Sequence, residues 1–257
     1  MPDSLLLKSA RVFDPAGRDF ERREVRIAGG KILEVGPELS AQAGEQTRDC
    51  RGRLLLPAFV DMHLHCFRLG QVLSVDAEAL APHAGTTTFV DAGSAGSMNF
   101  QAFREHVIEP AGVRILAFLN ISAIGMVSVG AATVPVQEND DDRLLDPVSA
   151  IEVIEQNRDL IVGVKVRMYT GLTSLTALRR GREVAERTGL PMMVHIAPGP
   201  PALADILPLL RAGDIVTHTY HGGADSWLDP RARAAFEEAR ARGVEFDVGL
   251  DRGHTSF

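Results

Sequence analysis

The chain lacks the features that mark secreted, membrane-spanning or nucleic-acid-binding proteins. Of its 257 residues only Cys50 and Cys66 are cysteines, which excludes a disulfide framework and favours a reducing cytoplasm. No apolar run approaches the roughly 20 residues that a transmembrane helix needs, and the first residues do not form a signal peptide. The formal net charge is −7 and no basic cluster is present, so neither a nucleic acid nor a membrane is an expected partner.

What the chain does contain is a change of pattern near residue 58. Residues 1–57 read as short strands and turns, with a hairpin expected about Gly29-Gly30, and predict a small N-terminal β module, a partial β-sandwich. From residue 58 apolar strands alternate with helices, which is typical of parallel βαβ construction. The expected strands are 58–65, 85–92, 113–121, 160–168, 191–197, 214–220 and 244–249. The prediction for 58–257 is an α/β fold, a (β/α)₈-type TIM barrel lacking its eighth strand.

Local signals predict several boundaries between these strands. Asp146-Pro147 and Asp229-Pro230 look like helix starts, each an N-cap aspartate followed by proline. The acidic run Glu138–Asp142 is expected to be a solvated loop, with a lid over a site as the alternative.

The most informative stretch is LPAFVDMHLHCF, residues 56–67, which ends an apolar run with His63 and His65. Residues i and i+2 of a strand point to the same face, so both imidazoles converge on one point. Two neutral imidazoles on a rigid strand form half of a metal site, especially for a zinc-type ion. An isolated H-x-H pair can also arise from packing alone.

Three further polar residues occupy the ends of expected strands. Lys165 lies inside the apolar segment LIVGVKVRMY, where a lysine must be paired, deprotonated or modified because burial disfavours a bare ammonium. An ion pair with a barrel carboxylate such as Asp61 or Asp91 is its structural alternative. His195 ends PMMVHIA and His218 ends DIVTHTY, and each taken alone could be a hydrogen-bonded core histidine. Together with the H-x-H pair they predict one site at the carboxyl ends of the strands.

These segments resemble a known family. LPAFVDMHLH is similar to the P-G-x-x-D-x-H-x-H signature of the amidohydrolase superfamily, with Ala58 at the usual glycine. VGVKVRM, VHIAPGP, VTHTYHGG and FDVGLDRGHTSF resemble its dihydroorotase-like amidohydrolase/deacetylase subgroup, and the similarity covers essentially the whole chain.

The resemblance implies a binuclear metal centre for two divalent ions, with zinc expected. His63 and His65 would bind the more buried ion, and His195 and His218 the other. Lys165 would be carboxylated by CO₂ and bridge the two. A metal-bound hydroxide would then attack an amide or ester bond of a small-molecule substrate.

One departure from the family concerns the catalytic base. Family members place an aspartate at the end of strand eight, whereas this chain ends at Phe257 after the seventh expected strand. Asp247 and Asp251 do not match that position, so no catalytic residue is identified. The expectation is therefore an incomplete barrel with unpaired edge strands, able to form a homo-oligomer through those edges.

Secondary candidates for substrate binding are Arg167, Tyr220 and His221. Arg167 shares a face with Lys165 and would pair with a substrate carboxylate or with a loop acid. His221 would contact substrate or cap its own loop. Cys66 points away from the H-x-H face and is interpreted as a small buried hydrophobe.

The leading hypothesis is a metal-dependent hydrolase of the amidohydrolase type. Deacetylation of an N- or O-acyl acid is favoured over dihydroorotase-like ring opening, and aminohydrolysis of a purine comes third. The alternative is a non-catalytic metal-binding remnant, or a fragment of such an enzyme.

Overall fold

The computed structural model describes residues 4–68, 70–130 and 136–250. The chain divides into two compact units, Met1–Ala58 and Phe59–Phe257, each with its own sheet. None of the helices in the described ranges combines the length and apolar character of a membrane span.

The N-terminal unit is a five-stranded sheet with the order β3-β2-β1-β4, and β5 also pairs with β1. Gly29 and Gly30 join β2 to β3 with φ angles of 56° and 72°. Positive φ at both central residues is what a tight hairpin turn of this kind requires, so the hairpin prediction is confirmed. The strands are β1 Ser4–Asp14, β2 Asp19–Ala28, β3 Lys31–Gly36, β4 Gln46–Asp49 and β5 Leu54–Leu55.

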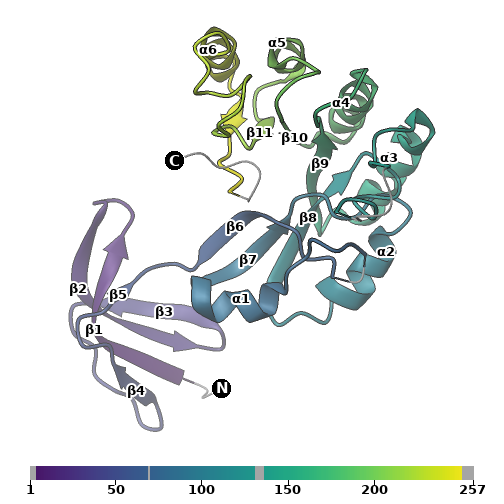
Figure 1. Ribbon diagram of the computed structural model, residues 1–257. Helices are drawn as coiled ribbons and strands as arrows, with labels where there is room; N and C mark the ends of the chain where they lie inside the picture. Colours follow the sequence, from purple (N-terminus) through teal and green to yellow (C-terminus); the bar gives the residue numbers. More distant parts are fainter. Residues whose placement is uncertain (1–3, 69, 131–135, 251–257) are drawn as a thin grey trace. The chain divides into compact units, whose positions relative to one another are not determined.

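The second unit is built on seven strands in the order β12-β11-β10-β9-β8-β7-β6, and each neighbouring pair is parallel. The sheet is curled like part of a barrel, with helices along its outer side (Figure 1). Within the described residues β6 and β12 share no neighbouring strand, which agrees with the predicted seven-stranded barrel. The strands are β6 Phe59–Leu64, β7 Thr86–Asp91, β8 Arg114–Asn120, β9 Ile161–Arg167, β10 Met192–His195, β11 Ile215–Thr217 and β12 Glu245–Phe246.

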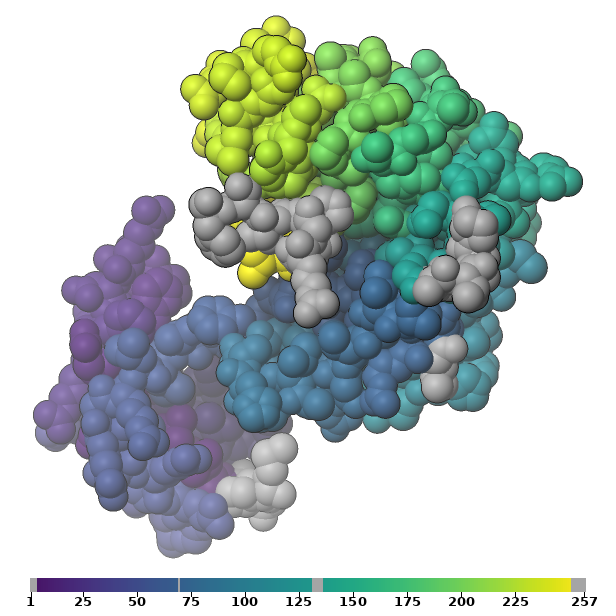
Figure 2. Space-filling model, in the orientation of Figure 1, coloured from purple at the N-terminus to yellow at the C-terminus, as the bar shows by residue number. Residues whose placement is uncertain are grey.

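The helices form the outer layer of the second unit, and the core lies between them and the sheet. In the space-filling view the green and yellow segments that carry α4, α5 and α6 form one closely packed layer (Figure 2). The α-helices are α1 Ala77–Ala84, α2 Phe100–Phe103, α3 Pro147–Gln156, α4 Thr176–Thr188, α5 Leu203–Ile206 and α6 Arg233–Ala241. Shorter turns are the π-helical η1 Arg104–Ile108 and the 3₁₀ segments η2 Asp142–Leu144 and η3 Leu207–Leu209.

One of the two predicted helix starts is confirmed. The Asp146 carboxylate accepts hydrogen bonds from the backbone N–H groups of Val148 and Ser149 at 3.0 and 3.2 Å, and α3 begins at the following proline. The prediction at Asp229-Pro230 is wrong, because α6 begins only at Arg233. Asp229 instead accepts a 2.9 Å hydrogen bond from the backbone of Arg231, which holds this segment in a turn before the helix.

Candidate functional site

Five residues singled out in the sequence line one cavity of about 410 Å³ in the second unit: His63, His65, Lys165, His195 and His218. They come from the carboxyl ends of four parallel strands, β6, β9, β10 and β11, which meet at the same edge of a curled sheet. The sequence therefore places all five where the structure brings them together.

The four imidazoles form a chain of ring contacts. The ring centroids of His63 and His65 are 5.9 Å apart, those of His63 and His218 are 5.0 Å apart, and those of His218 and His195 are 4.6 Å apart. His218 lies one residue beyond β11 with a φ of 66°, not inside the strand as the sequence predicts. That left-handed turn interrupts the strand directly after Thr217.

Lys165 lies beside these rings and is 1% exposed. Its Nζ atom is 3.4 Å from the Met193 sulfur. In the described part of the chain it forms no ion pair, so pairing with Asp61 or Asp91 is not what the structure shows. Burial, together with the nearby Arg167 charge, lowers the pKa of Lys165 to about 7. Near neutral pH a large fraction of this side chain is therefore an uncharged amine.

His63 is oriented by a carboxylate that sequence analysis did not select. Its Nδ1 atom lies 2.9 Å from Asp247 Oδ2 and 2.8 Å from Thr217 Oγ1, and the Thr217 hydroxyl donates to the same Oδ2 at 2.6 Å. Burial raises the pKa of Asp247, but these hydrogen bonds lower it to about 2. Because an ionised carboxylate can only accept, Nδ1 carries the proton and Nε2 is the nitrogen with the lone pair.

His218 and His65 are held through the same ring atom. His218 Nδ1 is 2.6 Å from the Gly249 carbonyl oxygen, which can only accept, so Nε2 again carries the lone pair. His65 Nδ1 is 2.9 Å from Ser94 Oγ. Burial, reinforced by the Lys165 charge, lowers the pKa of His65 well below its usual value. His65 is therefore neutral, which is the form that binds metals.

This set of donors fits a metal centre of the kind the resemblance implies. Three histidines are held through Nδ1, and the amine of Lys165 is in the form that adds CO₂. Among the described residues no three His, Cys, Asp or Glu side chains come within reach of one ion. The arrangement that the resemblance implies does not need three such side chains around one ion. Each ion would be held by two histidines, and the modified lysine would be a ligand of both.

Arg167 also lines the cavity, and the structure pairs it with a loop acid. Its Nη1 atom lies 2.7 and 2.8 Å from the two carboxylate oxygens of Glu138, a side chain that is fully buried. The expectation that the run Glu138–Asp142 is a solvated loop is therefore wrong at Glu138 and at Asn139, which is 4% exposed. The Asn139 amide donates to the Arg167 carbonyl at 2.8 Å and ties this loop to β9. A substrate contact by Arg167 stays a prediction.

Tyr220 and His221 are not among the residues that line this cavity. Tyr220 is 39% exposed and borders a separate cavity with Trp227 and Phe246. His221 is buried, and its Nδ1 accepts a 3.2 Å hydrogen bond from the backbone of Gly223, as the loop-capping alternative expects. A substrate role for these two residues stays a prediction.

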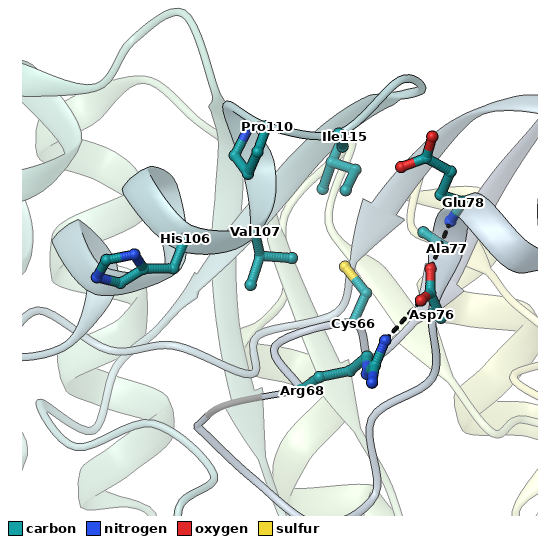
Figure 3. Close-up of a pocket in the computed structure, with 10 residues that line it drawn as sticks. Cys66, Arg68, Asp76, Ala77, Glu78, His106, Val107, Pro110 and Ile115 are labelled. Atoms are coloured by element: carbon teal, nitrogen blue, oxygen red, sulfur yellow. Dashed lines mark hydrogen bonds and ion pairs between the residues drawn. The ribbon is translucent and has the colours of Figure 1, made fainter.

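Another cavity, of about 340 Å³, lies in the helical layer near α1 and η1 (Figure 3). The Cys66 sulfur faces it near Val107 and Ile115, and neither His63 nor His65 lines it, as the alternation along the strand predicts. Burial raises the pKa of the Cys66 thiol, which disfavours the nucleophilic thiolate form. Arg68 and Asp76 form an ion pair at its rim. This cavity contributes nothing to the histidine site.

Sequence analysis did not predict the residues that hold the histidines. Ser94, Thr217 and Gly249 were not considered, Asp91 was named only as an ion-pair alternative for Lys165, and Asp247 was set aside as a catalytic candidate. One signal was available: Asp247 follows directly after the short strand β12, at the end where functional residues of such barrels gather. Pairing of Arg167 with a loop acid was one of the two alternatives from the sequence, which did not identify the acid as Glu138, 29 residues away.

Comparisons with known proteins agree with this fold. No protein-family model matches the chain. The chain is similar to a deacetylase of Agrobacterium fabrum, with 38% identity over 248 residues that cover 94% of this chain and 60% of the relative. A crystal structure of a dihydroorotase aligns with a TM-score of 0.87 and 33% identity, over 99% of this chain and 67% of that one. A crystal structure of an adenine deaminase aligns with a TM-score of 0.81 and 26% identity, over 98% and 67%.

The chain spans about three fifths of the length of the curated deacetylases that it matches. The similarity includes the N-terminal sheet, the curled parallel sheet and the strand ends that carry the histidines. The fold and these relatives show that the chain belongs to the amidohydrolase superfamily, in its dihydroorotase-like amidohydrolase/deacetylase group.

Proposed function

We propose that this chain is part or all of a metal-dependent hydrolase that cleaves an amide or ester bond in a small polar molecule. The observation that carries the proposal is the single cavity in which four histidines surround a buried lysine. Deacylation of an N- or O-acyl acid is the favoured reaction, because relatives that are 37–38% identical over about nine tenths of this chain are named deacetylases. Ring opening of a cyclic amide is the second candidate, since other relatives are named dihydroorotases.

His63 and His65 would hold one divalent ion and His195 and His218 the other, with zinc as the proposed metal. When bound, such a pair of ions supplies an activated water near neutral pH and polarises the substrate carbonyl. The protein's own part is to orient the imidazoles. Asp247 and Gly249 do this for His63 and His218 by accepting hydrogen bonds from Nδ1.

Lys165 would join the two ions after carboxylation. Its uncharged amine adds CO₂ and releases one proton, which forms an N–C bond and leaves an anionic carbamate. This change replaces a cation that burial disfavours with a group that can bind two cations at once. The lowered pKa of Lys165, about 7, makes the reactive amine available without a separate base.

The walls of the cavity indicate how a substrate would be held. Leu73, Val75, Met126 and Val129 line one part of it, and Arg167 stands beside Lys165. We propose that the apolar wall packs against the non-polar part of the substrate while the Arg167 guanidinium attracts its anionic part. The two cysteines are both free, which is consistent with the proposed cytoplasmic location.

The test is a substrate screen with the purified chain loaded with zinc in bicarbonate buffer. The panel contains acyl-amino acids, acyl-hydroxy acids and cyclic ureides. We expect turnover of at least one class, lost in Lys165→Ala and kept in Lys8→Ala, which changes a partly exposed lysine of the N-terminal sheet. Zinc binding without turnover of any class would support a non-catalytic metal-binding protein and overturn the hydrolase.

A further inference from the structure

A fully buried carboxylate, Asp91, lies at the end of β7 and has no part in the reaction proposed above. Its Oδ1 accepts from the backbone N–H groups of Gly93 and Ser94 at 3.0 and 2.6 Å. Its Oδ2 accepts from the backbone of Cys66 at 2.8 Å and from the Ser94 hydroxyl at 2.8 Å. Three of these groups are backbone N–H groups that can only donate, so both Asp91 oxygens act as acceptors here, although burial raises the pKa of Asp91.

The Ser94 hydroxyl links this carboxylate to His65. A hydroxyl has one hydrogen to donate and two lone pairs that accept. Its hydrogen goes to Asp91 Oδ2, which accepts it at 2.8 Å. One lone pair accepts from the Gln71 amide nitrogen at 3.2 Å. The orientation of that amide is set by its oxygen, which accepts from the backbone of Leu73 at 3.1 Å.

The remaining partner of the Ser94 hydroxyl is His65 Nδ1, at 2.9 Å. Since the hydroxyl has no second hydrogen to offer, this contact forms only when Nδ1 carries a proton. The lone pair of a neutral His65 is then on Nε2. The hydrogen-bond inventory thus selects one of the two neutral tautomers of this ring.

We propose that Asp91 and Ser94 are positioning residues that hold His65 in its Nδ1–H tautomer, with Nε2 as the ligand atom. The role as a metal ligand rests on the metal site proposed above, whereas the tautomer does not. Partners of this kind behind a ligating histidine fix its orientation, and their loss typically weakens metal binding by about 10–100-fold. The same hydroxyl also holds Gln71, whose segment carries Leu73 and Val75 of the cavity wall.

A purely structural role would be different: Asp91 would only stabilise the turn over residues 91–94. Ser94→Ala separates the two, because it removes the hydroxyl but keeps the three backbone donors of Asp91. The matched control is Ser97→Ala on the same loop, whose hydroxyl lies 2.8 Å from that of Ser149 and makes no contact with a histidine among the described residues.

The first measurement is the tautomer of His65 in the metal-free chain, from long-range ¹H–¹⁵N NMR correlations assigned with His65→Gln. We expect the Nδ1–H form in the wild type and in Ser97→Ala, and an appreciable Nε2–H population in Ser94→Ala. A wild-type His65 that is mainly Nε2–H would overturn the proposal that Asp91 and Ser94 select the Nδ1–H tautomer. This holds whether or not the chain binds metal and whether or not Ser94→Ala folds.

The second measurement is zinc affinity by competition with a chromogenic chelator. We expect zinc binding weaker by about 10–100-fold in Ser94→Ala and in Asp91→Asn, and unchanged in Ser97→Ala. Equal affinity of Ser94→Ala and wild type would contradict the positioning role. If the wild type binds no zinc, the proposed metal site is wrong. The tautomer measurement would then still test whether Asp91 and Ser94 hold His65 in its Nδ1–H form.

Discussion

At the scale of single residues, the site depends on what stands behind each imidazole. His63, His65 and His218 each have Nδ1 against an oxygen, supplied respectively by Asp247, a serine hydroxyl and a backbone carbonyl. Three different chemical groups thus contact the same ring nitrogen, Nδ1, of three histidines. Agreement among unrelated contacts is hard to explain by packing alone, and it favours a common task for the three rings.

Asp247→Ala tests this at the strongest contact. The change removes the acceptor of the His63 proton, so the ring loses its fixed orientation and tautomer. We expect zinc affinity to fall by about 10–100-fold, measured by chelator competition. Asp205→Ala, at an exposed aspartate of α5, is the control and should leave the affinity unchanged. Wild-type affinity in Asp247→Ala would show that the contact does not position a ligand.

Gly249 shows how narrow the space around His218 is. A Cβ atom there would lie 2.4 Å from Thr217 Oγ1 and 2.7 Å from His218 Nδ1, and the residue has a φ of 54°. Only glycine allows the backbone carbonyl to approach the ring in this way.

At the scale of elements, the pair Arg167–Glu138 connects β9 to the segment before η2. Glu138 is fully buried, so its removal leaves the Arg167 guanidinium, which is only 13% exposed, without its ion-pair partner. We expect Glu138→Leu to lower the free energy of unfolding by about 3–5 kcal/mol, and the double variant Arg167→Met/Glu138→Leu to recover most of that loss. Urea unfolding, followed by the fluorescence of Trp227, measures both.

The control for this cycle lies a few residues further along the same loop. Asp141 pairs with Arg143, whose side chain is 89% exposed, so Asp141→Ala should cost less than about 1 kcal/mol. Additive losses in the Arg167→Met and Glu138→Leu cycle would mean that the two side chains do not interact in solution.

In the N-terminal sheet, Glu45 is an acid-sensitive link. Its carboxylate accepts from Arg26 at 2.9 Å and from Ser4 at 2.7 Å, and these hydrogen bonds lower its pKa from its usual 4.5 to about 2. A carboxyl whose pKa is lower in the folded state stabilises that state above its unfolded pKa. This contribution is therefore present at neutral pH and is lost as the pH falls from about 4.5 to about 2.

Hydrogen exchange of peptides covering residues 4–28 reads this effect. In the wild type, we expect protection of β1 and β2 to fall between pH 4.5 and 2, and Glu45→Gln to show less protection at pH 7 and a flatter profile. Glu38→Gln, at an exposed glutamate of the same unit, should follow the wild type. If Glu45→Gln and wild type show the same pH dependence of protection, Glu45 is not the cause of the acid sensitivity of this sheet.

At the scale of the whole molecule, periodicity was enough to predict the parallel sheet. The seven segments become seven strands, each within its expected range. For the inner strands such as β8 to β10 the reason is that burial under helices requires apolar residues on both faces. The five metal-ligand candidates were predictable for a related reason. Parallel strands end at a common edge, so polar residues at their carboxyl ends, such as His195, must lie near one another.

The remaining features depend on contacts that no local pattern encodes. Asp247 reaches His63 across 184 residues, and Asp91 reaches Cys66 across 25. Asp229-Pro230 has the local signal of a helix start, but the contact of its carboxylate with Arg231 delays the helix. Such pairings are settled by the tertiary arrangement, after the local preferences have acted.

The whole sequence also offers an unusual experimental advantage at Lys165. The chain has only three lysines, Lys8, Lys31 and Lys165, against 24 arginines. Lys8→Arg/Lys31→Arg therefore leaves Lys165 as the sole lysine, and any carboxylated lysine in that variant can be assigned without ambiguity.

The metal content of Lys165→Ala tests the central claim most directly. Each protein is loaded with zinc in the presence of bicarbonate, freed of excess metal, and measured by plasma mass spectrometry. The wild type and Lys8→Arg/Lys31→Arg should retain two zinc ions per chain. Lys165→Ala and Lys165→Arg should not, because neither an alanine nor a permanently charged guanidinium can add CO₂ and bridge two cations. Two zinc ions per chain in Lys165→Ala would contradict the account.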